Sequence, residues 1–222
     1  RKIAEIGGID KKWFEQSVKP CVTSNKTNMY YQFYEVNNQV LKYFQTSLSD
    51  NKSNKIIQIA DKEDIASQEE YIWTAKEMTA SGQFRKGYEM KYFYERILGK
   101  PIYNPLFEKD EGAVVFNHLS DSIIEFGMDG TEQKAAPVTY DDGNDLKEII
   151  KDRFSNTYYL YYLNSGRANL VRLGLDYKPE KSTVIQEHIF PLNLKIKGGV
   201  AYFLNHSDDD FQKLKLYRQV LN

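Results

Sequence analysis

The stretch TYYLYYLNSGRANLVRLGL, from Thr157 to Leu175, carries the clearest fold signal in the chain. Two runs rich in tyrosine, leucine and valine flank Asn164-Ser165-Gly166-Arg167, a turn in which the glycine can adopt a positive φ. Aromatic and β-branched residues favour strands. The stretch therefore predicts a β-hairpin with strands at residues 157–163 and 168–175.

The chain around this hairpin, from residue 99 onward, is predicted to be rich in strands. Short β-prone runs are separated by turn signals, and the last pair of runs meets at Gly198-Gly199. The expected strands lie at residues 113–118, 122–128, 183–197 (interrupted at Pro191) and 200–204. Two helices are expected among them, one at residues 144–154 and a final one capped by Ser207 or Asp208.

The chain before residue 99 shows mostly helical spacing. One apolar stripe consists of Tyr30, Phe33, Tyr34, Leu41, Phe44 and Leu48. Residues 30–36 could equally form a strand, because the run is β-prone on both faces. A helix is expected to begin at Asp61 and to break at Ser81-Gly82, and another to run from Phe84 to Leu98.

These patterns predict an α+β fold. A mostly helical region, residues 1–98, is followed by a β-rich region, residues 99–222, that holds a mainly antiparallel sheet with two helices. A boundary near Gly99 is one expectation, and a single continuous domain is the other.

Composition narrows the classes of function. The 222 residues carry a net charge of -1, which argues against nucleic acid as a partner because phosphate binding needs concentrated Lys and Arg. No apolar run is long enough to span a bilayer, so we expect membrane attachment only through a segment outside this chain.

Because Cys21 is the only cysteine, no disulfide can form within the chain. We expect an extracytoplasmic or secreted location, with the cytoplasm as the alternative.

Tyrosine is the most informative residue type here, with 17 in the chain. Its rigid ring with a polar tip suits surfaces that contact a partner, and neighbouring cations strengthen that interpretation. We therefore predict binding of a protein, peptide or carbohydrate by residues of two clusters. The candidates are Tyr88, Tyr92, Tyr94 and Arg96 in the first cluster, and Tyr159 and Tyr161 in the second. Ordinary core and rim tyrosines are the alternative interpretation.

Acidic residues offer a second hypothesis, a metal-dependent hydrolase or nuclease. Carboxylates and a histidine can hold a metal ion when the fold brings them together. The candidate ligands are Glu125, Asp141, Asp142, His206 and Asp208. Each also has a structural explanation, since turns and the first turns of helices favour acidic residues.

No motif for a nucleophile, a phosphate loop or a cofactor accompanies these residues. Residues 99–126 with 173–205 resemble membrane-anchored regulators of bacterial sensor kinases, whereas residues 92–117 resemble the periplasmic region of certain export transporters. The two resemblances are incompatible and neither covers residues 1–90, so they identify no family. The sequence thus predicts a non-catalytic binding or regulatory domain without a cofactor, forming the extracytoplasmic part of a larger anchored protein.

Overall fold

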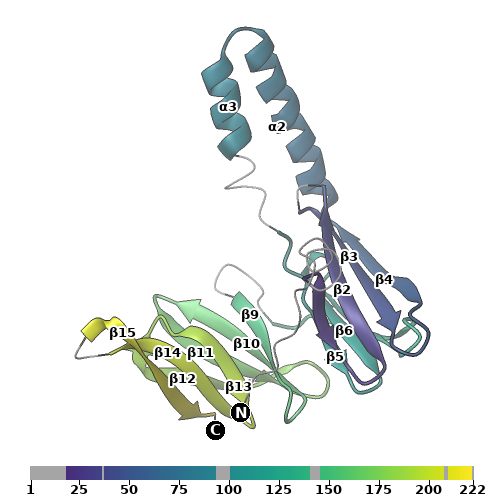
Figure 1. The fold of residues 1–222 in the computed structure, drawn as a ribbon. Helices are drawn as coiled ribbons and strands as arrows, with labels where there is room; N and C mark the ends of the chain where they lie inside the picture. The colour runs from purple at the N-terminus through teal and green to yellow at the C-terminus, as the bar shows by residue number, and fades with distance from the viewer. Residues whose placement is uncertain (1–18, 37, 94–100, 141–145, 208–209, 222) are drawn as a thin grey trace, which may run out of the picture. The chain divides into compact units, whose positions relative to one another are not determined.

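The computed structural model describes residues 19–36, 38–93, 101–140, 146–207 and 210–221 (Figure 1). Within these ranges the chain consists mostly of antiparallel β-strands, with two α-helices. It divides into two compact units, residues 1–120 with 124–134 and residues 121–123 with 135–222. The region around Gly99, where the sequence suggests a boundary, lies outside the described residues.

Two four-stranded sheets belong wholly or mostly to the first unit, and in each the strands pair in the order in which they follow along the chain. The first sheet consists of β1 (Cys21–Ser24), β2 (Asn28–Glu35), β3 (Val40–Ser47) and β4 (Ser53–Ala60). The second consists of β5 (Leu106–Lys109), β6 (Gly112–Asn117), β7 (Ser122–Phe126) and β8 (Glu132–Pro137), with a 3-10 turn, His118–Ser120, between β6 and β7.

The core of the first unit lies between these two sheets. Tyr30, Leu41 and Tyr43 of the first sheet are buried in one cluster with Ala113 and Val115 of β6. The Tyr43 hydroxyl donates a hydrogen bond to the Asn104 carbonyl oxygen at 2.7 Å, so its polar tip is satisfied inside the core. Burial raises the pKa of Tyr43 far above its ordinary value, which keeps the phenol neutral.

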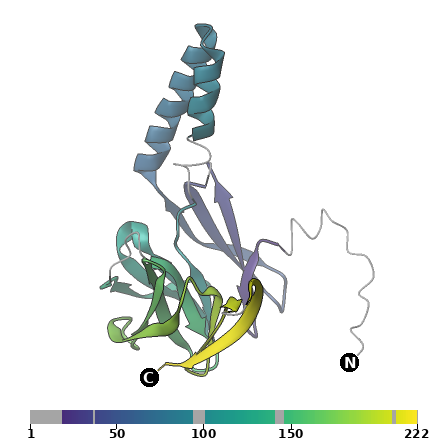
Figure 2. The ribbon, with the colours of Figure 1, turned by 90° about the vertical axis from the view of Figure 1, so that its left-hand side faces the viewer.

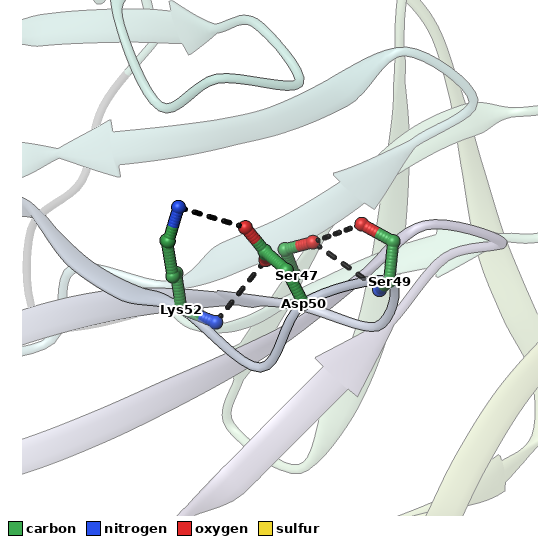
Figure 3. Close-up of polar contacts among 4 residues, drawn as sticks. All are labelled: Ser47, Ser49, Asp50 and Lys52. Atoms are coloured by element: carbon green, nitrogen blue, oxygen red, sulfur yellow. Dashed lines mark hydrogen bonds and ion pairs between the residues drawn. The ribbon is translucent and has the colours of Figure 1, made fainter.

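A polar turn joins β3 to β4 (Figure 3). The Asp50 carboxylate accepts a hydrogen bond from the Lys52 backbone N–H at 3.2 Å, and Ser47 and Ser49 bond to each other through their hydroxyls at 2.9 Å. The Lys52 backbone N–H and the Ser47 hydroxyl hold the pKa of Asp50 below its ordinary value. Asn51 has a φ of 57°, a left-handed conformation that asparagine tolerates well.

A helical hairpin follows β4. It consists of α2 (Lys62–Ala80) and α3 (Phe84–Phe93), which lie side by side in both ribbon views (Figure 1, Figure 2). The expected helix start at Asp61 and the expected break at Ser81-Gly82 are confirmed: Asp61 is the N-cap, Ser81 is the C-cap, and Gly82 has a φ of 83°. Neither described helix is long and apolar enough to cross a membrane.

The second unit contains two further sheets, again with the strands in chain order. One consists of β9 (Leu146–Asp152), β10 (Thr157–Asn164), β11 (Arg167–Leu173) and β12 (Pro179–Ile189). The other consists of β13 (Leu192–Lys197), β14 (Val200–Ser207) and β15 (Asp210–Val220). The hairpin predicted from TYYLYYLNSGRANLVRLGL is confirmed as β10 and β11, with Ser165 and Gly166 at φ values of 47° and 82° in the turn. The pair joined at Gly198-Gly199 is confirmed as β13 and β14.

The core of the second unit lies between these two sheets. Tyr159, Tyr161 and Leu170 of the first sheet pack in one cluster with Leu194 and Phe203 of the other. The buried Asp152 carboxylate also links the two sheets, because it accepts hydrogen bonds from the Phe154 backbone N–H at 3.0 Å, the Ser155 hydroxyl at 2.9 Å and the Gly199 backbone N–H at 2.9 Å.

The predicted helical N-terminal part is wrong. Residues 28–35 and 40–47 are the paired strands β2 and β3, and α2 and α3 follow only after β4. The apolar residues of this segment fit helical spacing by coincidence across the turn between the strands. Register explains the true pattern. Tyr34 pairs with Leu41 and Gln32 pairs with Tyr43, so Tyr30 and Tyr34 of β2 share one face of the sheet with Leu41 and Tyr43 of β3.

Two helices predicted in the second half are also wrong. Residues 146–152 form β9, in which Ile150 pairs with Tyr159. Residues 210–220, where the final helix was expected, form β15, in which Tyr217 pairs with Phe203. In both segments charged residues separate the apolar ones at intervals that also fit a helix. Pairing with a neighbouring strand that carries aromatic side chains outweighs this local preference for a helix. The structure is thus mostly antiparallel sheet, with a helical hairpin following the fourth strand.

Candidate functional site

The helical hairpin holds the most exposed cluster of predicted binding residues. Its first helix is fixed at its start by Asp61, whose side chain accepts a hydrogen bond from the Asp64 backbone N–H at 2.9 Å. Glu63 and Asp64 lie in the first turn, where the positive end of the helix dipole favours carboxylates. The hairpin therefore begins at a defined position directly after β4.

The two helices approach each other closely at Gly87 of α3. A Cβ atom at this position would lie 2.5 Å from the Thr79 side-chain oxygen and 2.7 Å from the Ala75 carbonyl oxygen, both on α2. Thr79 holds its hydroxyl in place by donating to the same Ala75 carbonyl oxygen at 2.8 Å. Only glycine therefore fits this crossing without displacing α2.

A groove of about 760 Å³ runs along this crossing. Its apolar lining comes from both helices, and two lysines are its only charged lining residues. The lining residues on α2 are Ile72, Ala75, Lys76, Thr79 and Ala80, and those on α3 are Phe84, Gly87, Tyr88 and Lys91. An apolar groove with basic residues suits a partner surface that is apolar and flanked by carboxylates.

Large aromatic side chains on α3 are exposed beside this groove. Phe84 is 67% exposed and Tyr88 is 70% exposed. Tyr88 also stacks on Tyr92, one helical turn further on, with ring centroids 6.4 Å apart. Such a row of exposed rings on one helix is typical of an interaction surface, since burying them against a partner removes apolar area from water.

The other predicted binding residues fall into two groups. Tyr94 and Arg96 fall outside the described residues. Tyr159 and Tyr161 are 6% and 7% exposed and belong to the core between the two sheets of the second unit. The structure therefore brings Tyr88 and Tyr92 together on one surface and places the described tyrosines of the second cluster inside.

The candidate metal ligands are not brought together in the described part of the chain. Glu125 forms an ion pair with Lys109 and a longer one with Lys134, at 3.9 Å. His206 lies exposed on β14, opposite Leu214 of β15. Asp141, Asp142 and Asp208 lie outside the described residues. Among the residues that are described, no three of the His, Cys, Asp and Glu side chains form a group that could hold a metal ion.

Sequence reasoning missed Phe84 and Gly87 as parts of this site. A usable signal was present, because Phe84, Tyr88 and Lys91 follow the i, i+4, i+7 spacing of one helix face. The role of Gly87 depends on its contact with α2, which the sequence does not display.

Comparison with known proteins adds no assignment: no protein-family profile matches this chain, and no curated protein sequence is significantly similar to it.

Proposed function

We propose that this protein is a non-catalytic binding domain whose helical hairpin binds an amphipathic helix of a partner protein. The observation that carries the proposal is the groove between α2 and α3, with the exposed Phe84 and Tyr88 rings along it. Two antiparallel helices form a natural cradle for a third, because side chains of the third helix pack into the groove between them. Helix-in-groove binding is an established mode of peptide recognition.

Charge refines the expected partner. Lys76 and Lys91 line the groove, and no acidic residue does. A helix with apolar residues at i, i+3, i+4 and i+7 and with Asp or Glu flanking that stripe complements this surface.

Selection from a displayed library of helix-forming peptides tests the proposal. The wild-type protein should select acidic amphipathic helices, and the double variant Phe84→Ala/Tyr88→Ala should bind the same synthetic peptides at least ten-fold more weakly. The exposed Trp73, which does not line the groove, supplies the matched control, since Trp73→Ala should bind like wild type.

Three outcomes contradict the proposal. The double variant could bind the selected peptides as well as wild type does, the library could yield no binder, or a glycan array could show carbohydrate binding that depends on Tyr88. The last outcome would retain the site and replace the partner class.

Location belongs to the same proposal. An extracytoplasmic domain of an anchored protein would expose its surface to reagents that cannot enter the cytoplasm. Labelling of an epitope tag in intact source cells, compared with lysed cells, tests this location.

A further inference from the structure

The outer edge of β12 presents an unusual arrangement in the second unit. In its sheet, β12 is an edge strand, since the order is β12-β11-β10-β9. The side chain of Gln219, on β15 of the other sheet, lies against this edge. Its amide oxygen accepts a hydrogen bond from the Gln186 backbone N–H at 2.9 Å, and its amide nitrogen donates to the Val184 carbonyl oxygen at 2.9 Å.

One carboxamide thus bonds the two backbone groups that a neighbouring strand would bond. The carbonyl of one strand residue and the N–H of the second residue beyond it point to the same side, where a pairing strand supplies a donor and an acceptor. Gln219 supplies both from a single side chain. The geometry shows that this stretch of β12 is aligned for pairing on its outer side.

A cleft of about 600 Å³ lies beside this contact, within the size range of ligand sites. It is lined by residues of β12, including Lys181 to Val184, and by residues of β14 and β15. His188 lies in its wall, with its ring 4.0 Å from the Tyr217 ring and 5.4 Å from the Phe203 ring, measured between centroids. Phe203 is buried in the core, but the half-buried rings of His188 and Tyr217 offer an aromatic surface to an inserted side chain.

The charged side chains that line the cleft give it a small positive excess of two cations over one carboxylate. Lys181 and Arg218 line it, and Glu187 is the acidic residue among the lining side chains. An inserted segment with a carboxylate is therefore favoured over a basic one.

We propose that the β12 edge is a strand-addition site that binds an extended, acidic peptide segment of a partner protein. The peptide replaces the Gln219 carboxamide, pairs with Val184 and Gln186 through its backbone, and places alternate side chains against the His188 surface. Main-chain hydrogen bonds supply affinity in this mode, and the side-chain surfaces supply specificity. This site is independent of the helical hairpin and does not rest on its proposed function.

Val184→Pro is the variant that isolates backbone pairing. Because the Val184 carbonyl points outward, its N–H points outward too, so proline removes a donor from the outer edge only. The pairing of Thr183 with Leu170 of β11 remains available, and an edge strand tolerates proline at such a position. Val184→Thr keeps the N–H and the β-branched shape and serves as the matched control.

The experiment selects 12-residue peptides from a displayed library on the wild-type chain, after depletion on the Val184→Pro protein. We expect extended sequences of alternating β-branched or aromatic residues that contain Asp or Glu. Synthetic copies should bind wild type and Val184→Thr equally, and Val184→Pro at least ten-fold more weakly. Gln219→Ala should bind more tightly than wild type, because the peptide no longer displaces the carboxamide.

Four results would overturn the proposal. The first is that the peptides bind wild type and Val184→Pro equally, when both proteins show the same circular dichroism and melting temperature. The second is that Phe84→Ala/Tyr88→Ala loses binding of these peptides, and the third is that the library yields no peptide. The fourth is that the wild-type chain is a dimer and Val184→Pro converts it to a monomer. The last result would assign the edge to a second copy of this chain, and selection of no peptide would leave Gln219 as a cover that protects an edge strand.

Discussion

The two tyrosine clusters of this chain have similar tyrosine content, but one is exposed in the structure and the other is buried. Tyr88 and Tyr92 lie exposed on α3, whereas Tyr159 and Tyr161 lie buried between two sheets. The helical cluster is interspersed with charged residues, as in Lys86, Glu89 and Lys91. The strand cluster contains no charged residue from Thr157 to Leu163. Tyrosine content alone therefore does not identify a binding surface, but the charges between the rings do help.

The physical reason is that a central strand buries both of its faces. Leu160 and Tyr158, on the face opposite Tyr159 and Tyr161, are also buried. A helix of a two-helix hairpin, in contrast, packs one stripe on its neighbour and leaves the rest exposed. The clusters should respond in opposite ways to mutation.

Removing a ring from the strand cluster should have the largest effect on stability. Tyr159→Ala leaves a cavity in the core of the second unit, and we expect a loss of about 3–5 kcal/mol in the free energy of unfolding. Urea denaturation measures it. Tyr159→Phe, which keeps the ring, is the control and should cost far less; a Tyr159→Ala protein as stable as wild type would contradict the assignment of this cluster to the core.

Asp152 should have the next largest effect. Burial raises the pKa of this carboxyl, but hydrogen bonds from the backbone N–H groups of Gly199, Gly198 and Phe154 and from the Ser155 hydroxyl outweigh that influence, so its pKa lies below the ordinary value. Asp152→Ala leaves these donors without their acceptor, and we expect a loss of about 2–3 kcal/mol at neutral pH.

The sign of the pH dependence follows from the lowered pKa. The stabilisation by Asp152 is fully present above the unfolded pKa of about 4 and is lost as the pH falls through the lower folded pKa. Denaturation curves between pH 7 and pH 2 should therefore show a smaller difference between wild type and Asp152→Asn at the acidic end. A difference that stays constant over this range would contradict the lowered pKa.

In the hairpin, Gly87→Ala should have a smaller effect. The added methyl group collides with Thr79 and with the Ala75 carbonyl oxygen, at a cost of about 1–3 kcal/mol, while alanine's better helix propensity returns about 1 kcal/mol. We expect a small net loss, together with weaker binding of the selected helical peptides because the groove changes shape. Lys86→Ala, at the exposed neighbouring position, should change neither.

An element of this fold could be predicted from the sequence where the residues that determine it lie close together along the chain. The β10–β11 hairpin and the start of α2 were predictable because a turn at Ser165-Gly166 and a cap at Asp61 are encoded within a few residues. For β2 the sequence left helix and strand open, and for β3 and β15 it favoured a helix, because the apolar spacing of all three fits a helix as well as a strand. Their pairing partners decide between the two, and pairing is a tertiary property.

The candidate sites show the same division. Tyr88 and Tyr92 could be predicted because their rings stand among charged residues on one expected helix. The β12 edge could not, because its signal is a contact between Gln219 and backbone groups more than thirty positions away along the chain. Such contacts leave no local pattern in the sequence.

Truncating the helical cluster should have the smallest effect on stability, and this result decides the comparison. Tyr88 is 70% exposed, so Tyr88→Ala removes little buried area, and we expect the free energy of unfolding to change by no more than about 0.5 kcal/mol. Urea denaturation of Tyr88→Ala beside Tyr159→Ala measures both rings on one scale. If Tyr88→Ala were as destabilising as Tyr159→Ala, the Tyr88 ring would be a core residue, and this face of the hairpin would not be a binding surface. A Tyr88→Ala protein that is as stable as wild type but no longer binds the selected helices would instead show that this ring acts in partner binding. Its removal would then lower the affinity for the partner without changing the free energy of unfolding.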